Sequence, residues 1–284
     1  MRRGVLFFLA SCQIFTDSDV VQCRTDADCE SRGGLFKGSV CKDLTCAGPT
    51  ACRDHVTWEA EDTSRPLHTH VLFVDFGLKP VVGAKAIVCA QLDPSCDRPS
   101  APFVTDERGY ALIEIPRAFR GQIRVQERPP GFDETYLPTS LVTFPPVVVD
   151  ETLATEVPSY AAVRLLTRAQ LDLLLALVGK KTEPGKAVVL GAVYDCNLKP
   201  LRDATVSASP ADSNRLFFLG DDSDVLTNTR KTTAGSAIFA FLNVTPGLVE
   251  VEATYQNTRW SKVQVVTSPD VITTFEMPPS PPSP

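Results

Sequence analysis

Two histidines, His68 and His70, come nearest in this sequence to the spacing of a metal site. Positions two apart on an extended strand project from the same face, so both imidazoles would lie side by side. Asp75 or His55 would supply a third ligand of the kind that zinc accepts. The alternative is an exposed strand start with two polar side chains. We favour that alternative and predict no metal at these residues.

Catalytic motifs are absent from the sequence. It contains no H-E-x-x-H, no G-x-S-x-G, no Walker loop and no G-x-G-x-x-G. The acidic run Asp221, Asp222 and Asp224 lacks the spacing and the closing Glu of an EF-hand, which favours a solvated turn over a calcium site. We therefore predict a protein that is not an enzyme and that has neither a cofactor nor a metal ion.

Composition narrows the class of protein. The apolar fraction of 43% is typical of a globular chain. The net charge of -6 argues against a nucleic-acid partner, which requires clustered Lys and Arg. No apolar run approaches the roughly 20 residues that span a bilayer.

The cysteines indicate an oxidising compartment. There are nine, an odd number that normally leaves one thiol to explain in an exported protein. If the first takes lipid, eight remain and all can pair. The predicted lipidation site is Cys12, and the disulfide candidates are Cys23, Cys29, Cys41, Cys46, Cys52, Cys89, Cys96 and Cys196.

The N-terminus has the layout of a secretory signal. Arg2 and Arg3 precede the apolar run 5–10, and a small residue, Ser11, precedes Cys12. Residues 9–12, Leu-Ala-Ser-Cys, resemble the bacterial lipobox. The resemblance implies cleavage before Cys12 and acylation of its sulfur and its amine, and several chains anchor a protein stably. An ordinary buried strand or a misplaced start is the alternative. Gln13 stands where Asp would favour inner-membrane retention, which hints at the outer membrane.

Residues 23–52 form a segment with five cysteines and few apolar residues. A segment this poor in apolar residues requires covalent cross-links to form a stable fold. It resembles small cysteine-rich modules of myxobacterial surface lipoproteins. A zinc site is the weaker interpretation, because no C-x-x-C pair occurs.

The rest of the chain repeats a pattern. Residues 75–84 and 195–204 share Asp, Leu-Lys-Pro and Ala in register, between strand-like runs at 71–74 and 86–89 and at 188–194 and 205–208. Thr105 to Gly109 correspond to Thr232 to Gly235, and each leads into a further strand, at 110–115 and 238–242. Runs such as 249–255 alternate apolar and polar residues, which indicates half-buried strands. Many short strands between turns predict two tandem antiparallel sandwiches.

These repeats, at about 68–126 and 186–255, resemble carboxypeptidase regulatory-like or transthyretin-like domains. The resemblance implies a prealbumin-like sandwich that serves as an accessory module. We therefore predict a mainly β fold: two tandem antiparallel prealbumin-like β-sandwiches, one connecting helix and a small disulfide-rich N-terminal module.

One helix is predicted between the repeats. Thr167 and Gln170 form a capping box, Leu171, Leu174, Leu175 and Val178 share a face, and Gly179 closes the end. Leu173 and Leu177 widen the apolar face, which predicts a helix enclosed between the two sandwiches. The Pro-rich residues 278–284 are expected to be an extended, disordered tail.

The predicted segments are a signal peptide (1–11), a lipidated tether (12–22), a cysteine-rich module (23–56), a first sandwich (57–157), a helical connector (158–183), a second sandwich (184–277) and the tail (278–284). Pairing of Cys89 with Cys96 closes a short loop, and Cys196 would then join the N-terminal cluster at Cys52.

The predicted function is a membrane-anchored envelope protein that binds a protein or a glycan. Trp58 and Trp260 could stack on a sugar, and Phe217 and Phe218 could form an exposed patch, although aromatic residues in sandwiches are more often core. The alternatives are an envelope spacer and an accessory subunit of a hydrolase or transport system.

Overall fold

In the computed structural model, the described residues are 23–30, 41–42, 44–46, 56–75, 77–91, 93, 95–127, 136–143, 162–196, 200–210, 215–218, 226–227, 232–233 and 237–281. The predicted mainly β architecture is confirmed. Among the described residues, no helix is long and apolar enough to cross a membrane.

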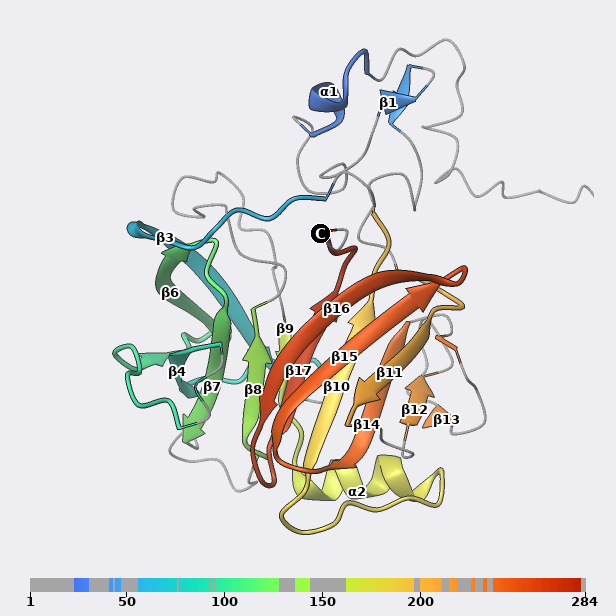
Figure 1. Ribbon diagram of the computed structural model, residues 1–284. Helices are drawn as coiled ribbons and strands as arrows, with labels where there is room; N and C mark the ends of the chain where they lie inside the picture. The colour runs from blue at the N-terminus through green and yellow to red at the C-terminus, as the bar shows by residue number, and fades with distance from the viewer. Residues whose placement is uncertain are drawn as a thin grey trace, which may run out of the picture.

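A small module stands at the N-terminal end of the described chain. It contains helix α1 (Asp26–Glu30) and the hairpin of β1 (Cys41–Lys42) and β2 (Thr45–Cys46). Disulfides join Cys23 to Cys41 and Cys29 to Cys46. Figure 1 shows this module at the opposite end of the molecule from helix α2.

The first repeat is a sandwich of two sheets. One has the order β6 (Tyr110–Arg117), β3 (Asp62–Val74) and β9 (Ala162–Arg164). The other contains β5 (Phe103–Val104), β4 (Lys85–Ala90), β7 (Gly121–Glu127) and β8 (Thr139–Val142). Phe73, Ile115, Ile123 and Leu165 are among the residues that fill the space between them.

The second repeat has the same strand connections. Its first sheet contains β13 (Leu226–Thr227), β12 (Arg215–Phe218), β14 (Ile238–Val244), β10 (Ala187–Val193) and β17 (Ile272–Met277). Its second sheet has the order β11 (Thr205–Ser209), β15 (Gly247–Tyr255) and β16 (Thr258–Thr267). Phe239, Phe241, Phe275 and Trp260 are large members of the core between them.

Equivalent strands pair alike in the two repeats. β3 pairs antiparallel with β6 and parallel with β9, as β10 does with β14 and β17. In the other sheet β4–β7–β8 corresponds to β11–β15–β16, all antiparallel. The sequence repeat at residues 75–84 and 195–204 therefore corresponds to a repeat of the strand topology. Parallel pairs also occur, because the last strand of each repeat returns beside its first.

A single nine-stranded sheet joins the two sandwiches. β17 of the second repeat pairs in parallel with β8 of the first, through Ile272↔Thr139 and Thr274↔Leu141. Adjacent residues of β8 face different cores: Leu141 lies in the first and Val142 in the second. Because neighbouring strand residues point to opposite faces, the two smaller sheets pack on opposite faces of the shared sheet.

Helix α2 (Arg168–Ala176) lies directly after β9 and has the predicted capping box. Gln170 N donates to Thr167 Oγ1 (3.2 Å), and Thr167 N donates to Gln170 Oε1 (2.9 Å). Leu171, Leu174 and Leu175 pack on one face of the β14–β10–β17 sheet. Figure 1 shows helix α2 below the strands of this sheet. The prediction that Leu173 and Leu177 are enclosed is wrong, because these side chains are 67% and 69% exposed. The helix covers one sheet face, since the sandwiches join through a strand pair and leave no space for a helix between them.

The start of the Pro-rich tail also differs from its prediction. Pro278, Pro279 and Ser280 are buried, and Ser280 N donates to Trp260 O (3.0 Å). This contact places the segment beside the edge strand β16, where a backbone acceptor is available. Proline lacks an N–H, and Ser280 supplies the donor.

Candidate functional site

The two predicted histidines lie on the solvent-facing side of the β6–β3–β9 sheet. Thr69, Val71 and Phe73 of β3 point into the core, so the alternate residues His68 and His70 point outward. The cross-strand pairs are His68↔Glu114, His70↔Leu112 and Leu72↔Tyr110. We call these six residues the β3–β6 outer face.

Aromatic and charged side chains contact each other on this face. His68 Nε2 lies 3.7 Å from Glu114 Oε2. The rings of His70 and Tyr110 meet edge to face at 6.2 Å, and the guanidinium of Arg108 lies 5.7 Å from the Tyr110 ring centroid. Leu112 remains 49% exposed among them. Arg and Tyr are residue types that are enriched in protein interfaces.

Backbone hydrogen bonds support the turn that leads into this face. Tyr110 N and Arg108 N each donate to Asp106 Oδ1 (2.9 Å). The bond from Tyr110 N is the main cause that holds the pKa of Asp106 below its usual value. Gly109 has φ +78°, and a Cβ there would lie 2.7 Å from Phe73 O. A glycine is therefore required where the chain reverses into β6.

The described residues do not bring a metal site together at the histidines. Asp75 Oδ1 accepts from Lys79 N (2.8 Å) in the repeat turn, and His55 lies outside the described residues. Only Cys23, Cys29 and Cys41 form a close group of three possible ligands in the described ranges, and all three are in disulfides. Disulfide sulfur cannot act as a thiolate ligand.

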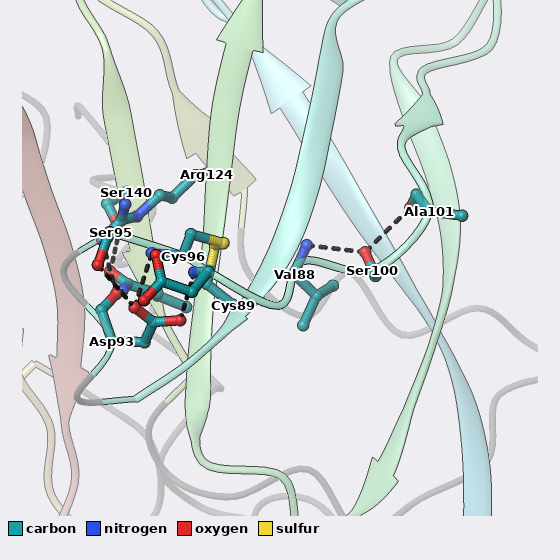
Figure 2. The surroundings of a disulfide bond; sticks show 11 residues. Val88, Cys89, Asp93, Ser95, Cys96, Ser100, Ala101, Arg124 and Ser140 are labelled. Atoms are coloured by element: carbon teal, nitrogen blue, oxygen red, sulfur yellow. Dashed lines mark hydrogen bonds between the residues drawn. A yellow bond between two sulfur atoms is a disulfide. The ribbon is translucent and has the colours of Figure 1, made fainter.

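The disulfide Cys89–Cys96 closes a loop on the shared sheet (Figure 2). Asp93 holds the loop, because its carboxylate accepts from Cys96 N (2.7 Å) and Asp97 N (2.8 Å). Its carbonyl accepts from the buried Gln122 and from Arg124, both on β7. Gln91 Nε2 donates to Gln264 O on β16 (3.3 Å), so the loop also contacts the second sandwich.

Cys196 is disulfide-bonded and its partner lies outside the described residues, where the sequence contains Cys12 and Cys52. The predicted pairing of Cys196 with Cys52 and the predicted lipidation of Cys12 therefore both fall outside the described residues.

Of the other predicted binding residues, the two tryptophans have different surroundings. Trp260 is a core residue whose Nε1 donates to Tyr194 O (2.8 Å), and Trp58 lies 5.9 Å from the Arg120 guanidinium. Phe217 and Phe218 belong to β12, and the placement of their side chains lies outside the description, as does the run 221–224. Sequence reasoning missed Tyr110, Leu112 and Glu114, although the alternation along 110–115 places all three on one face.

A shallow hollow of about 600 Å³ lies beside helix α2. Its lining includes the basic residues Arg168, Lys180 and Lys181 and the acidic residues Asp172 and Asp270. The balance of charges indicates no particular ligand.

Two partly buried ionisable groups lie near the end of the shared sheet. Burial raises the pKa of Glu276 on β17. Burial and, to a smaller extent, the nearby Glu276 raise the pKa of Tyr194 to about 12.

No family model matches the chain, and no curated protein is similar to it. Among solved structures, it is remotely similar to the Bacillus anthracis TIE protein (TM-score 0.26, 12% identity, 76% of this chain and 34% of that one). Others are the shaft pilin SpaA of Lactobacillus rhamnosus GG (TM-score 0.25, 12% identity, 78% and 100%) and BcpA, the major pilin subunit of Bacillus cereus (TM-score 0.26, 8% identity, 76% and 100%). The chain thus matches about a third of the TIE protein's length. Similarity this remote carries no information on function.

Proposed function

We propose that this chain is an exported protein, lipid-anchored at Cys12, that acts by binding a protein or a glycan in the cell envelope. The observation that carries the proposal is the state of the cysteines. All seven cysteines in the described residues are in disulfides. Such bonds persist in exported proteins and are rare in the reducing cytosol.

Lipidation requires that Cys12 does not pair with Cys196. Val56 packs against the core cluster that contains Cys196. Cys52 is only four residues away in the chain, so it is within roughly 14 Å of Val56 even if the chain is fully extended. We therefore assign Cys52 as the partner of Cys196, which leaves Cys12 as the single cysteine available for lipid.

Mass spectrometry of the mature N-terminus tests the anchor. We expect a chain that begins at acylated Cys12, and a Cys12→Ser variant that leaves the membrane fraction. Non-reducing peptide mapping gives an independent readout, a Cys52–Cys196 peptide. A Cys12–Cys196 peptide, or an unmodified Cys12 in a freely soluble wild type, would refute the anchor.

The β3–β6 outer face is the surface we assign to binding. It presents Tyr110, Leu112 and His70 to solvent beside the charges of Arg108 and Glu114. By contrast, the solvent-facing side of β11–β15–β16 presents Ser207, Glu252 and Lys262 across its strands, an ordinary water-facing composition. Substitution of Leu112 with Lys is expected to weaken ligand capture, whereas the same change at Ser207 is a matched control.

A rigid spacer is the second candidate, favoured by the β17–β8 pairing that joins both sandwiches. A spacer would keep its cellular role with Leu112→Lys, provided the variant is folded. Loss of that role with a normal circular dichroism spectrum would favour binding.

A further inference from the structure

The internal repeat allows the same sheet face to be compared in two settings. In the second repeat, the outward face of β14–β10–β17 carries Val188, Leu190 and Leu242, and α2 packs on it. In the first repeat, the equivalent positions are His68, His70 and Glu114, because Asp75 and Asp195 align and the strand pairings match. Within the described part of the chain, no helix packs on this face of the first repeat.

The β3–β6 outer face keeps an apolar centre although it faces solvent. Leu112 occupies the position of Ala240, which α2 covers in the second repeat. It is 49% exposed, between the edge-to-face pair His70–Tyr110 and the His68–Glu114 contact. The leucine and the two rings together give this face an apolar centre that a partner can cover.

Helix α2 carries a second uncovered surface. Its inward residues Leu171, Leu174 and Leu175 are buried. The opposite side consists of Ala169, Leu173 and Ala176, followed by the C-cap residue Leu177, and all four are exposed. We call these four residues the α2 stripe. A helix that is apolar on both sides is normally buried on both sides.

We propose that the α2 stripe of one copy of this chain docks on the β3–β6 outer face of a second copy. The contact would reproduce between molecules the helix-on-sheet packing that the second repeat already makes within one molecule. It would cover Leu173 and Leu177 of one copy and Leu112 of the other in a single step.

The charges around the two surfaces are complementary. Glu114 on the sheet face, with its side chain 67% exposed, can meet the exposed Lys181 beside the helix. Arg108, 81% exposed, can meet Asp172 on the flank of the α2 stripe. A symmetric pairing of two α2 helices is disfavoured, because an antiparallel contact centred on Leu173 would place the two Asp172 carboxylates side by side.

The contact is head to tail, so each docked copy still offers one unused surface of each kind. Such contacts form rings if the rotation closes and open chains if it does not. The area available on a nine-residue helix is small. We therefore expect weak association, whose extent rises with protein concentration. This inference names a second copy as the partner in the binding role proposed above.

Sedimentation velocity of the mature chain from residue 12 tests the proposal. All samples carry Cys12→Ser, so the outcome is independent of whether the lipid anchor exists. One variant is Leu173→Lys/Leu177→Lys, a second is Leu112→Lys, and the control is Leu248→Lys at another leucine that is 55% exposed. Circular dichroism and disulfide mapping verify that each variant is folded.

We expect the parent chain and the control to associate, and each interface variant to associate at least ten times more weakly. An equimolar mixture of the two variants retains one intact surface of each kind and should form dimers and nothing larger. A parent chain that stays monomeric at a protein concentration of about 1 mM, where even a complex with a millimolar Kd would form in part, would overturn the proposal. So would a mixture that stays monomeric, or a control variant that loses association.

Discussion

Two buried threonines perform the same task in the two repeats. Thr105 Oγ1 donates to Val81 O (2.6 Å) and accepts from Ala84 N (2.9 Å). Thr233 Oγ1 does the same with Leu201 O (2.6 Å) and Ala204 N (3.0 Å). Each hydroxyl closes the turn that follows the Asp–Pro segment. The structural equivalent of Thr105 in the second repeat is thus Thr233. The sequence pattern aligns Thr105 with Thr232, one residue earlier.

Replacement of Thr233 with Val should strongly destabilise the protein. The change leaves a buried donor and a buried acceptor without partners, each of which costs about 1–3 kcal/mol. We expect the free energy of unfolding, measured in urea, to fall by about 2–6 kcal/mol. Thr233→Ser keeps the hydroxyl and is the matched control. Equal losses for Val and Ser would show that the hydrogen bonds are not responsible.

Glu276 gives the protein a pH-dependent stability. Its pKa is raised by burial, so its charged form is disfavoured in the folded state. Its contribution to stability is fully present below the unfolded pKa and is lost as the pH rises through the higher folded pKa. Glu276→Gln should therefore raise the free energy of unfolding at pH 8 and leave it nearly unchanged at pH 4. Chemical denaturation at both pH values measures this, and a difference that is larger at pH 4 would contradict it.

At the scale of elements, the Cys89–Cys96 loop is a short staple on a sheet surface. The bond spans seven residues, and closing a loop of that size stabilises by about 2–3 kcal/mol in the chain-entropy model. A Cys89→Ser/Cys96→Ser variant should lose about that amount in thermal or urea unfolding. The hydrogen bonds from the amides of residues 96 and 97 to the Asp93 carboxylate should also weaken, which hydrogen exchange at these two amides can follow. Unchanged protection of these amides would show that Asp93 holds the loop without the bond.

Helix α2 depends on its capping box for its first turn. Thr167→Ala removes the acceptor for Gln170 N, and such a loss costs typically about 1 kcal/mol. Thr167→Ser keeps the acceptor and should behave like the parent chain. The free energy of unfolding is the measurement, and equal stability of the Ala and Ser variants would contradict the role of the cap.

At the scale of the whole molecule, the β17–β8 pairing makes one sheet out of two repeats. Ile272, Thr273 and Thr274 each pair with β10 on one side and β8 on the other. Separation of the sandwiches would therefore break a ladder in the middle of the sheet, where buried backbone groups find no water.

We expect a single calorimetric unfolding transition for the two sandwiches. Its calorimetric and van't Hoff enthalpies should agree, because separation of the repeats would leave the facing edges of β8 and β17 unpaired. Two resolved transitions, or an enthalpy ratio near two, would show that the repeats unfold independently.

Much of the fold could be predicted from local patterns. Strands such as 249–255 show their period of two, and the helix has both its cap and its apolar face in the sequence. The pairing of Cys89 with Cys96 follows from a separation of only seven residues. The candidate site was found in part: His68 and His70 drew attention, but Leu112 and Glu114 lie more than 40 positions away, and only strand pairing brings them together.

By itself, then, the sequence determined several strands, the capped helix and the Cys89–Cys96 pair, since these depend on neighbours within about ten residues. Only the tertiary structure decided that β17 meets β8 across more than 120 residues, and that the small sheets lie on opposite faces of the shared sheet. It also decided that Leu173 and Leu177 face solvent. The physical reason is that an apolar residue in the sequence indicates that its side chain is suited to burial. What buries it depends on which strands pair in the folded chain.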